Sequence, residues 1–170
     1  MVLGMSLATF TLVHVVLSLI GIFAGLVVLA GMFRSRRLSG WIALFLATTV
    51  LTSVTGFFFP FERLLPSHVV GIISLVVLAV ALWALYVRHL TGAARWIYVS
   101  TAVLALYLNV FVAVVQAFLK IPFLKALAPT QAEPPFVIAQ GPVLVLFVVL
   151  GILAVRSFHP EGEAFTLKTA

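Results

Sequence analysis

The sequence predicts an all-α membrane protein, a polytopic bundle of five transmembrane helices. Hydrophobic residues make up 64% of the 170 residues and charged residues only 8%, whereas a soluble domain has about 25% charged residues and covers its surface with them. Five apolar runs are long enough to cross the hydrocarbon core of a bilayer, which takes about 20 helical residues. Both observations indicate that most of the surface faces lipid.

The expected helices begin and end at recognisable signals. The first stops before the basic stretch "RSRR", and nothing before it resembles a basic n-region or an A-x-A-like cleavage site, so we expect it to be retained rather than removed as a signal peptide. The second begins at the interfacial Trp41 and is stopped by Pro60, in a tight outer turn that Pro66 closes. Ser67 is the expected N-cap of the third helix. Trp96 marks the start of the fourth helix.

The long connection "KIPFLKALAPTQAEPPF" carries four prolines, which prevent a continuous helix. We expect a short interfacial turn there, followed by an extended, kinked segment. The five helices are predicted over about 8–33, 41–61, 67–87, 96–119 and 136–155. They form a single domain over 1–158, and 159–170 is expected to be a flexible cytoplasmic tail.

The ten lysines and arginines predict the orientation. Cytoplasmic loops of membrane proteins carry an excess of these residues, and seven of the ten fall on one side of the predicted bundle. The prediction is therefore N-terminus out and C-terminus in. The seven are Arg34, Arg36, Arg37, Arg88, Arg95, Arg156 and Lys168, against Arg63, Lys120 and Lys125 on the other side.

Composition also excludes several classes of partner and cofactor. The net charge is +6, but the basic residues lie at the ends of apolar runs, which is typical of contact with lipid headgroups and not of a nucleic-acid groove. Cysteine is absent, which excludes disulfides, thiolate metal sites and covalent haem attachment.

Polar residues recur at helical spacing inside the apolar runs. Asn109, Gln116 and Lys120 fall within about 40° of one another on the fourth helix. His14 and Ser18 form a matching stripe on the first helix. Polar side chains in the hydrocarbon core are costly and normally face protein or a cavity, so these stripes are expected to point into the bundle. The second helix offers a similar face with Thr48, Thr52 and Thr55.

Counting from the basic ends of the helices places several of these residues at one depth. His14 lies 20 residues before Arg34, and His68 lies 20 before Arg88, which is about 30 Å along a helix. We therefore predict a polar pocket near the outer leaflet that binds a small ligand or lipid. Its predicted residues are His14, Ser18, His68, Asn109, Gln116, Lys120 and Gln140.

Two alternatives use the histidines as metal ligands. Haem b in membrane bundles takes one axial histidine from each of two helices, and His14 with His68 match that pattern, with Arg63 and Lys120 as partners for the propionates. A divalent metal held by both histidines and Glu62 is a weaker alternative. The favoured interpretation is structural, with both histidines hydrogen-bonded near an interface.

The sequence gives little support for an enzyme. No nucleophile–base constellation, phosphate loop or dinucleotide fingerprint is visible, and no carboxylate falls inside a predicted span. The preferred function is non-enzymatic: binding of a small ligand or lipid, or service as an accessory subunit of a membrane complex. A small uncoupled channel or carrier is a further alternative, through the threonine face of the second helix.

Gly21 and Gly25 form a small-xxx-small motif in "GIFAG", a pattern that brings helices into close contact. The motif fits either a homo-oligomer or close packing inside one bundle. Expected partners are thus the lipid bilayer, other membrane subunits or a second copy of the chain, and no nucleic acid.

The stretches "TSVTGFFFPFE" and "ALYLNVFVAVVQAFLKIPFLKALAPTQAEPPFVIAQ" resemble a group of small, uncharacterised bacterial inner-membrane proteins, over most of the chain. The outer loop "KIPFLKALAP" is also loosely similar to DoxX-like membrane proteins, which generally have four helices. The resemblance implies a multi-pass protein of the bacterial inner membrane and no particular activity.

Overall fold

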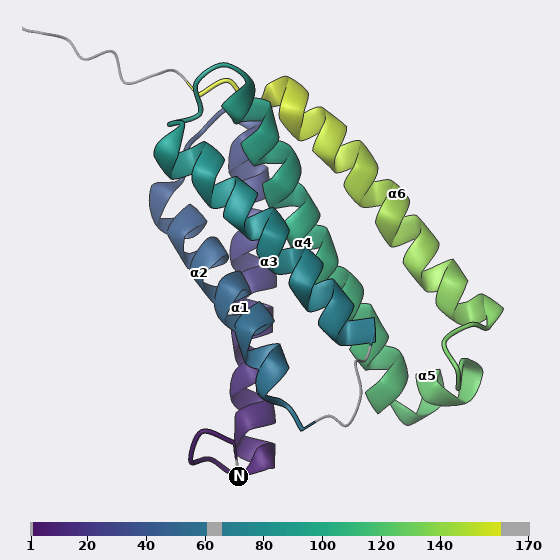
Figure 1. Cartoon of the computed structure of the whole chain (residues 1–170). Coiled ribbons are helices and arrows are strands. Elements are labelled where there is room, and N and C mark those ends of the chain that lie inside the picture. Colours follow the sequence, from purple (N-terminus) through teal and green to yellow (C-terminus); the bar gives the residue numbers. More distant parts are fainter. Residues whose placement is uncertain (1, 61–65, 161–170) are drawn as a thin grey trace, which may run out of the picture.

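The computed structural model describes residues 2–60 and 66–160, and these residues are helical apart from short connections and an isolated bridge between Val2 and Met5 (Figure 1). A 3-10 turn, η1 (Gly56–Phe58), extends α2, and a π turn, η2 (Trp83–Val87), extends α3. The α-helices are α1 (Leu7–Phe33), α2 (Ser39–Thr55), α3 (Pro66–Leu82), α4 (Ala93–Lys120), α5 (Pro122–Leu127) and α6 (Pro134–Ser157).

The predicted fold class and the five long apolar helices are confirmed. Within the described residues, five helices are long and apolar enough to cross a membrane, as in a multi-pass membrane protein. Most observed ends lie within three residues of the predicted ones. The regular α-helix ends earlier than expected in two of the helices. Helix α2 ends at Thr55 and continues as η1 to Phe58, and α3 ends at Leu82 and continues as η2 to Val87. Phe61, the predicted end of the second span, lies outside the described residues. The orientation of the termini stays a prediction.

Helix α4 is the centre of the bundle and packs against α1, α3 and α6. Helix α1 packs mainly against α2, and α2 also contacts α3. Helix α6 lies at the edge, and in Figure 1 it diverges from α1 toward the end that carries α5. We call the other end of the bundle the basic end: α1, η2 and α6 finish there, α2 and α4 begin there, and it carries Arg34, Arg88, Arg95 and Arg156.

The apolar core is concentrated in the half of the bundle near the basic end. Phe45, Leu85, Val99 and Leu106 are almost completely buried there. Toward the opposite end the buried residues include polar ones, such as His68, Ser74 and Asn109. The buried residues are therefore mainly apolar near the basic end and include several polar ones toward the other end.

Glycines bring α1 close to its neighbours. A Cβ atom added to Gly25 would lie 2.6 Å from Leu106 Cδ1 and 2.9 Å from Phe45 Cε2. Gly21 is likewise buried against α2 and α4. The face of α1 that carries the small-xxx-small motif is thus covered by α2 and α4 of the same chain. Packing inside one bundle is therefore enough to explain the motif. Association of two copies through this face stays a prediction.

The connection between the last two spans is more helical than the sequence suggested. Residues 122–127 form α5, and α6 begins at Pro134, two residues earlier than expected. The prolines at 122, 134 and 135 occupy first-turn positions. A backbone N–H at these positions would have no acceptor within the helix, so proline costs no hydrogen bond there. A further proline, Pro142, lies inside α6.

Glu133 closes the turn before α6, and this turn is expected to depend on pH. Its carboxylate accepts hydrogen bonds from Thr130 Oγ1 (2.9 Å), Thr130 N (3.1 Å) and Ala132 N (3.1 Å). Partial desolvation raises the pKa of Glu133, but these hydrogen bonds outweigh it and hold the pKa below its usual value of 4.5. The bonds therefore stabilise the turn at neutral pH and are lost as the pH falls through that lowered pKa.

The measurement is hydrogen exchange of the Thr130 and Ala132 amides as the pH is lowered below 4.5. We expect their protection factors, corrected for intrinsic exchange, to fall in the wild type. In Glu133→Gln, which cannot ionise, they should not change with pH. Equal pH dependence in the two proteins would show that another group controls the turn.

Candidate functional site

Two of the predicted pocket residues, Ser18 and Asn109, meet in a polar cluster between α1, α2 and α4. Ser18 Oγ donates to Asn109 Oδ1 over 2.9 Å, and Asn109 is only 6% exposed. Gly21 lies beside them, since a Cβ there would be 3.1 Å from Asn109 Nδ2 and 3.2 Å from the hydroxyl oxygens of Thr48 and Thr49. The small residue on α1 thus lets an amide from α4 and two hydroxyls from α2 meet.

His14 lies on the same face of α1, nearer its N-terminus. Its Nδ1 is 2.8 Å from Thr55 Oγ1, and Thr55 Oγ1 donates its own hydrogen to Leu51 O at 2.7 Å. This contact links α1 to α2 at the level of Thr55. The imidazole also packs edge-on against Phe59, with centroids 5.1 Å apart.

Three polar atoms in or beside this cluster are buried without a hydrogen-bond partner among the described residues: Asn109 Nδ2, Thr49 Oγ1 and Thr52 Oγ1. Thr48 and Thr55, by contrast, bond back to carbonyls of their own helix. A buried unpaired polar group costs about 1–3 kcal/mol. The cluster is therefore a place where water or a small polar molecule would be stabilised.

The structure does not bring the other predicted residues into this cluster. His68 is buried on α3 with its ring 5.7 Å from that of Phe57. Gln140 Nε2 donates to Phe111 O between α6 and α4. Gln116 and Lys120 are exposed near the end of α4. Apart from the residues of the cluster, the predicted pocket residues therefore lie in three other places.

Metal binding gains no geometric support from the described residues, which contain no group of three or more histidine or acidic side chains that could hold a metal ion. Glu62 and Arg63 lie outside the described residues. The haem b hypothesis for His14 and His68 stays a prediction. Each of these rings packs on a different phenylalanine of residues 57–59.

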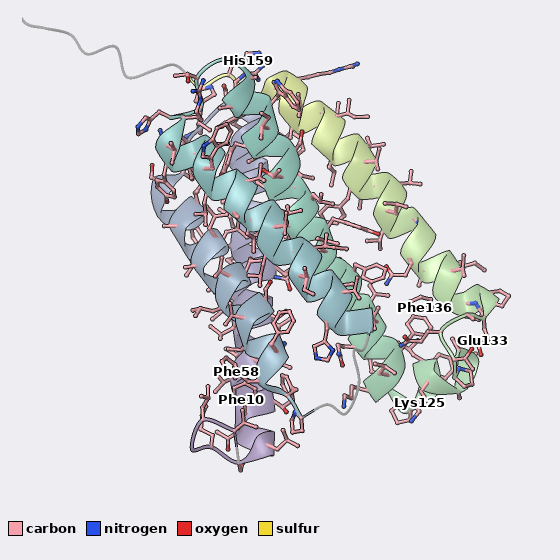
Figure 2. All side chains as sticks on the ribbon, in the orientation of Figure 1. Phe10, Phe58, Lys125, Glu133, Phe136 and His159 are labelled. Atoms are coloured by element: carbon pink, nitrogen blue, oxygen red, sulfur yellow. The ribbon has the colours of Figure 1, made fainter. Side chains whose placement is uncertain are left out.

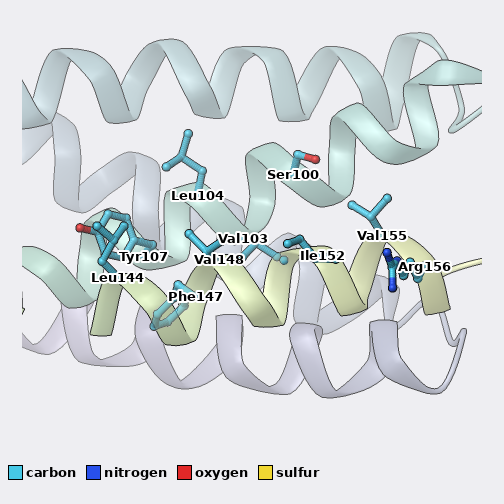
Figure 3. A pocket seen from close by; sticks show the side chains of 11 residues that line it. Ser100, Val103, Leu104, Tyr107, Leu144, Phe147, Val148, Ile152, Val155 and Arg156 are labelled. Carbon is cyan, nitrogen blue, oxygen red and sulfur yellow. The ribbon is translucent and has the colours of Figure 1, made fainter. Parts of the chain in front are cut away.

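The structure contains a groove that the sequence reasoning missed (Figure 3). It lies between α4 and α6, has a volume of about 400 Å³ and is open to the surroundings of the bundle. Its walls are mainly aliphatic and aromatic, with Ser100, Tyr107 and Arg156 as the polar members. The other lining residues are Val103, Leu104, Leu144, Phe147, Val148, Gly151, Ile152 and Val155.

One face of each helix forms this α4–α6 groove. The lining positions recur every three or four residues, from Ser100 to Tyr107 on α4 and from Leu144 to Arg156 on α6, as expected for a helix face. In Figure 3, Arg156 stands at one end of the row of α6 side chains, and Leu144 with Tyr107 at the other. The groove therefore has a cationic end, at the basic end of the bundle, and an apolar end near mid-span.

The lining residues of the groove include no carboxylate, histidine or cysteine. An apolar channel with one cation at its end matches an amphipathic molecule with an anionic head. The sequence signal was present but weak: small residues at Ser100 and Gly151 on the facing helices, with Arg156 one turn and a half beyond Gly151.

Comparison with known proteins adds no relative. No protein-family model matches the chain, and no curated protein or solved structure matches it significantly.

Proposed function

We propose that this protein binds an anionic, lipid-like amphipath in the α4–α6 groove, as a non-enzymatic lipid-binding protein or as a lipid-binding accessory subunit of a membrane complex. The observation that carries the proposal is the groove itself, apolar along its length and cationic at one end. Its volume of about 400 Å³ falls within the range of roughly 300–1,000 Å³ that is usual for small-molecule sites.

The length of the groove supports a lipid as the ligand. Leu144 and Arg156 are twelve residues apart on α6, which corresponds to roughly 18 Å along the helix axis. One leaflet contributes about half of the roughly 30 Å hydrocarbon core. An acyl chain could therefore run along the groove from mid-bilayer, and its headgroup would then reach the guanidinium of Arg156.

Charge at the basic end supports an anionic headgroup. Arg156 lies in the last turn of α6, and Arg95 lies in the first turns of α4 beside it. A basic residue near the membrane surface contributes about 1 kcal/mol of attraction to anionic lipid. With the predicted orientation in a bacterial inner membrane, the bound lipid would belong to the cytoplasmic leaflet.

The polar cluster of α1, α2 and α4 has a different role in this proposal. Its hydrogen bonds link helices, as Ser18 and Asn109 do, and such bonds contribute about 0.6 kcal/mol each on average in membranes. The cluster thereby holds α4 in place while the opposite face of α4 forms the groove.

Filling the groove should remove the bound lipid. Val148 lines the groove and is exposed, so Val148→Trp is expected to obstruct the acyl chain without disturbing the core. We expect native mass spectrometry of the detergent-purified protein to show anionic lipid retained by the wild type. In Val148→Trp the retained fraction should fall by about tenfold, the equivalent of about 1.4 kcal/mol.

Val149→Trp is the matched control, because Val149 is the next residue of α6, is similarly exposed and does not line the groove. Its lipid retention should equal that of the wild type. Arg156→Gln should weaken anionic lipid specifically and leave zwitterionic lipid unchanged. If Val148→Trp and Val149→Trp retain the same lipid, the groove is ordinary lipid-facing surface and the proposal fails.

A further inference from the structure

A second, larger cleft lies at the basic end of the bundle. Its volume is about 1050 Å³, and it is bounded by the α1–α2 connection, the connection from η2 to α4 and the segment after α6. Figure 2 labels His159 at this end. The lining residues are Arg34, Ser35, Arg37, Ser39, His89, Leu90, Thr91, Arg95, His159 and Pro160.

The lining is strongly cationic and includes no carboxylate. Three arginines and two histidines face the cleft together with the hydroxyl-bearing Ser35, Ser39 and Thr91. Glu133, the one glutamate within the described residues, is at the opposite end of the molecule in Figure 2. Glu161 and Glu163 lie outside the described residues. Among the residues that the structure describes, no carboxylate lies beside the arginines of this cleft, and converging like charges cost free energy unless an anion joins them.

Two helices have their N-termini at this cleft. Helix α2 starts at Ser39 and α4 at Ala93, and neither has a side chain capping its first-turn N–H groups. Uncapped N–H groups at a helix start attract anions through both hydrogen bonding and the helix dipole. The two helix N-termini add to the positive electrostatic potential that the arginines create in the cleft.

The cleft is also pre-organised. Arg95 Nη1 donates to the carbonyls of Val155 and Phe158, and His159 N donates to Ser35 Oγ at 2.8 Å. Ser35, His89 and Leu90 adopt positive φ angles of 54°, 48° and 60°, a conformation that costs an L-residue about 1–2 kcal/mol. The walls are thus tied to one another, and backbone strain is concentrated in the connections that form them.

We infer that this cleft is a binding site for a phosphate group carrying two or more negative charges, distinct from the α4–α6 groove. Guanidinium groups bind phosphate oxygens in bidentate geometry, and the volume exceeds that of a single phosphate, so a pyrophosphate or a phosphate ester fits. The phosphate can belong to a soluble molecule or to a lipid headgroup. This inference does not rest on the proposed lipid groove.

The test uses the full chain in phosphatidylcholine nanodiscs, titrated with inorganic pyrophosphate by isothermal titration calorimetry. Arg34 and Arg37 are exposed, so Arg34→Gln and Arg37→Gln should fold as the wild type does. Each removes a charged hydrogen bond and should weaken binding about tenfold or more. Arg36→Gln is the matched control, because Arg36 lies in the same connection and does not line the cleft.

A second arm measures retention of phosphatidic acid by the same variants, because that lipid presents a phosphate monoester. Saturable pyrophosphate binding that is weakened only in the cleft variants supports the site with a soluble ligand. Retention of phosphatidic acid that is lost only in the cleft variants supports the site with a lipid ligand. Binding of neither probe, or an equal loss in Arg36→Gln, would overturn the inference and leave only a diffuse positive field.

Val148→Trp separates this inference from the proposed function. Because Val148 lines the groove and not the cleft, pyrophosphate affinity should be unchanged in that variant. The two proposals can therefore fail independently.

Discussion

Gly25→Val is expected to destabilise the bundle by about 3 kcal/mol, at the upper end of the range for overpacked cores. A Cβ atom alone would lie 2.6 Å from Leu106 Cδ1 and 2.9 Å from Phe45 Cε2, and both neighbours are buried. The two γ-methyl groups of valine have even less room, and their β-branching limits the rotamers that could avoid the clash. Helices α2 and α4 would have to move apart from α1. SDS-induced unfolding in mixed micelles measures the change.

Gly40→Val is the control for this experiment. Gly40 lies in the first turn of α2, and a Cβ there would meet nothing within 4 Å, so the same substitution should change the unfolding free energy little. An equal loss in both variants would mean that the cost comes from replacing a helical glycine and not from the close crossing of α1 with its neighbours.

Arg95→Gln is expected to release the end of α6 from the bundle. The guanidinium donates from Nη1 to Val155 O and Phe158 O, two carbonyls at the C-terminus of α6. A hydrogen bond to a charged group contributes about 1.5–3 kcal/mol, and few buried contacts hold α6 elsewhere, since its buried residues are Gln140, Phe147 and Ala154. We expect about 2 kcal/mol less protection, which means roughly 30-fold faster amide exchange in the last turn.

The Phe158 amide is the best reporter, because its hydrogen bond to Ala154 O closes that turn. Arg156→Gln is the control. It also removes one positive charge near this turn, but it leaves the Arg95 hydrogen bonds intact, so it should alter amide exchange only slightly. Arg95→Lys should protect the turn partially, since lysine keeps the charge but cannot reproduce the guanidinium geometry. If Arg95→Gln and Arg156→Gln behave alike, Arg95 does not fasten α6.

The spans could be predicted from the sequence because hydropathy and length depend on one helix at a time. The pairing of Ser18 with Asn109 was within reach for a related reason. Each residue belongs to a polar stripe with helical spacing, and such stripes turn away from lipid. Gln116 shares that stripe but is exposed, since the helices diverge toward the end of α4 and the same helix face loses its cover.

The sequence held only a weak signal for the α4–α6 groove, and the basic cleft could not be predicted from it. Each depends on how far apart two or more helices lie, and no single-helix pattern encodes that distance. From the sequence alone, Arg156 is interpreted as an interfacial anchor; only the structure shows that it stands at the end of an apolar groove between α4 and α6. From the sequence alone, Arg34, Arg37 and Arg95 are likewise interpreted as topology signals; only the structure shows that the α1–α2 connection and the start of α4 bring them to one cleft.

Photolabelling of the unmodified protein tests the lipid-binding claim most directly. The protein is reconstituted with an anionic phospholipid that carries a diazirine in its acyl chain, illuminated, and mapped by peptide mass spectrometry. The proposal predicts adducts concentrated at Leu104, Val148 and Ile152, which line the groove and are exposed, well above those at Leu19 and Phe23, which are exposed on α1 away from the groove. Adducts spread evenly over the exposed residues of α1 and α6 would contradict a lipid site between α4 and α6.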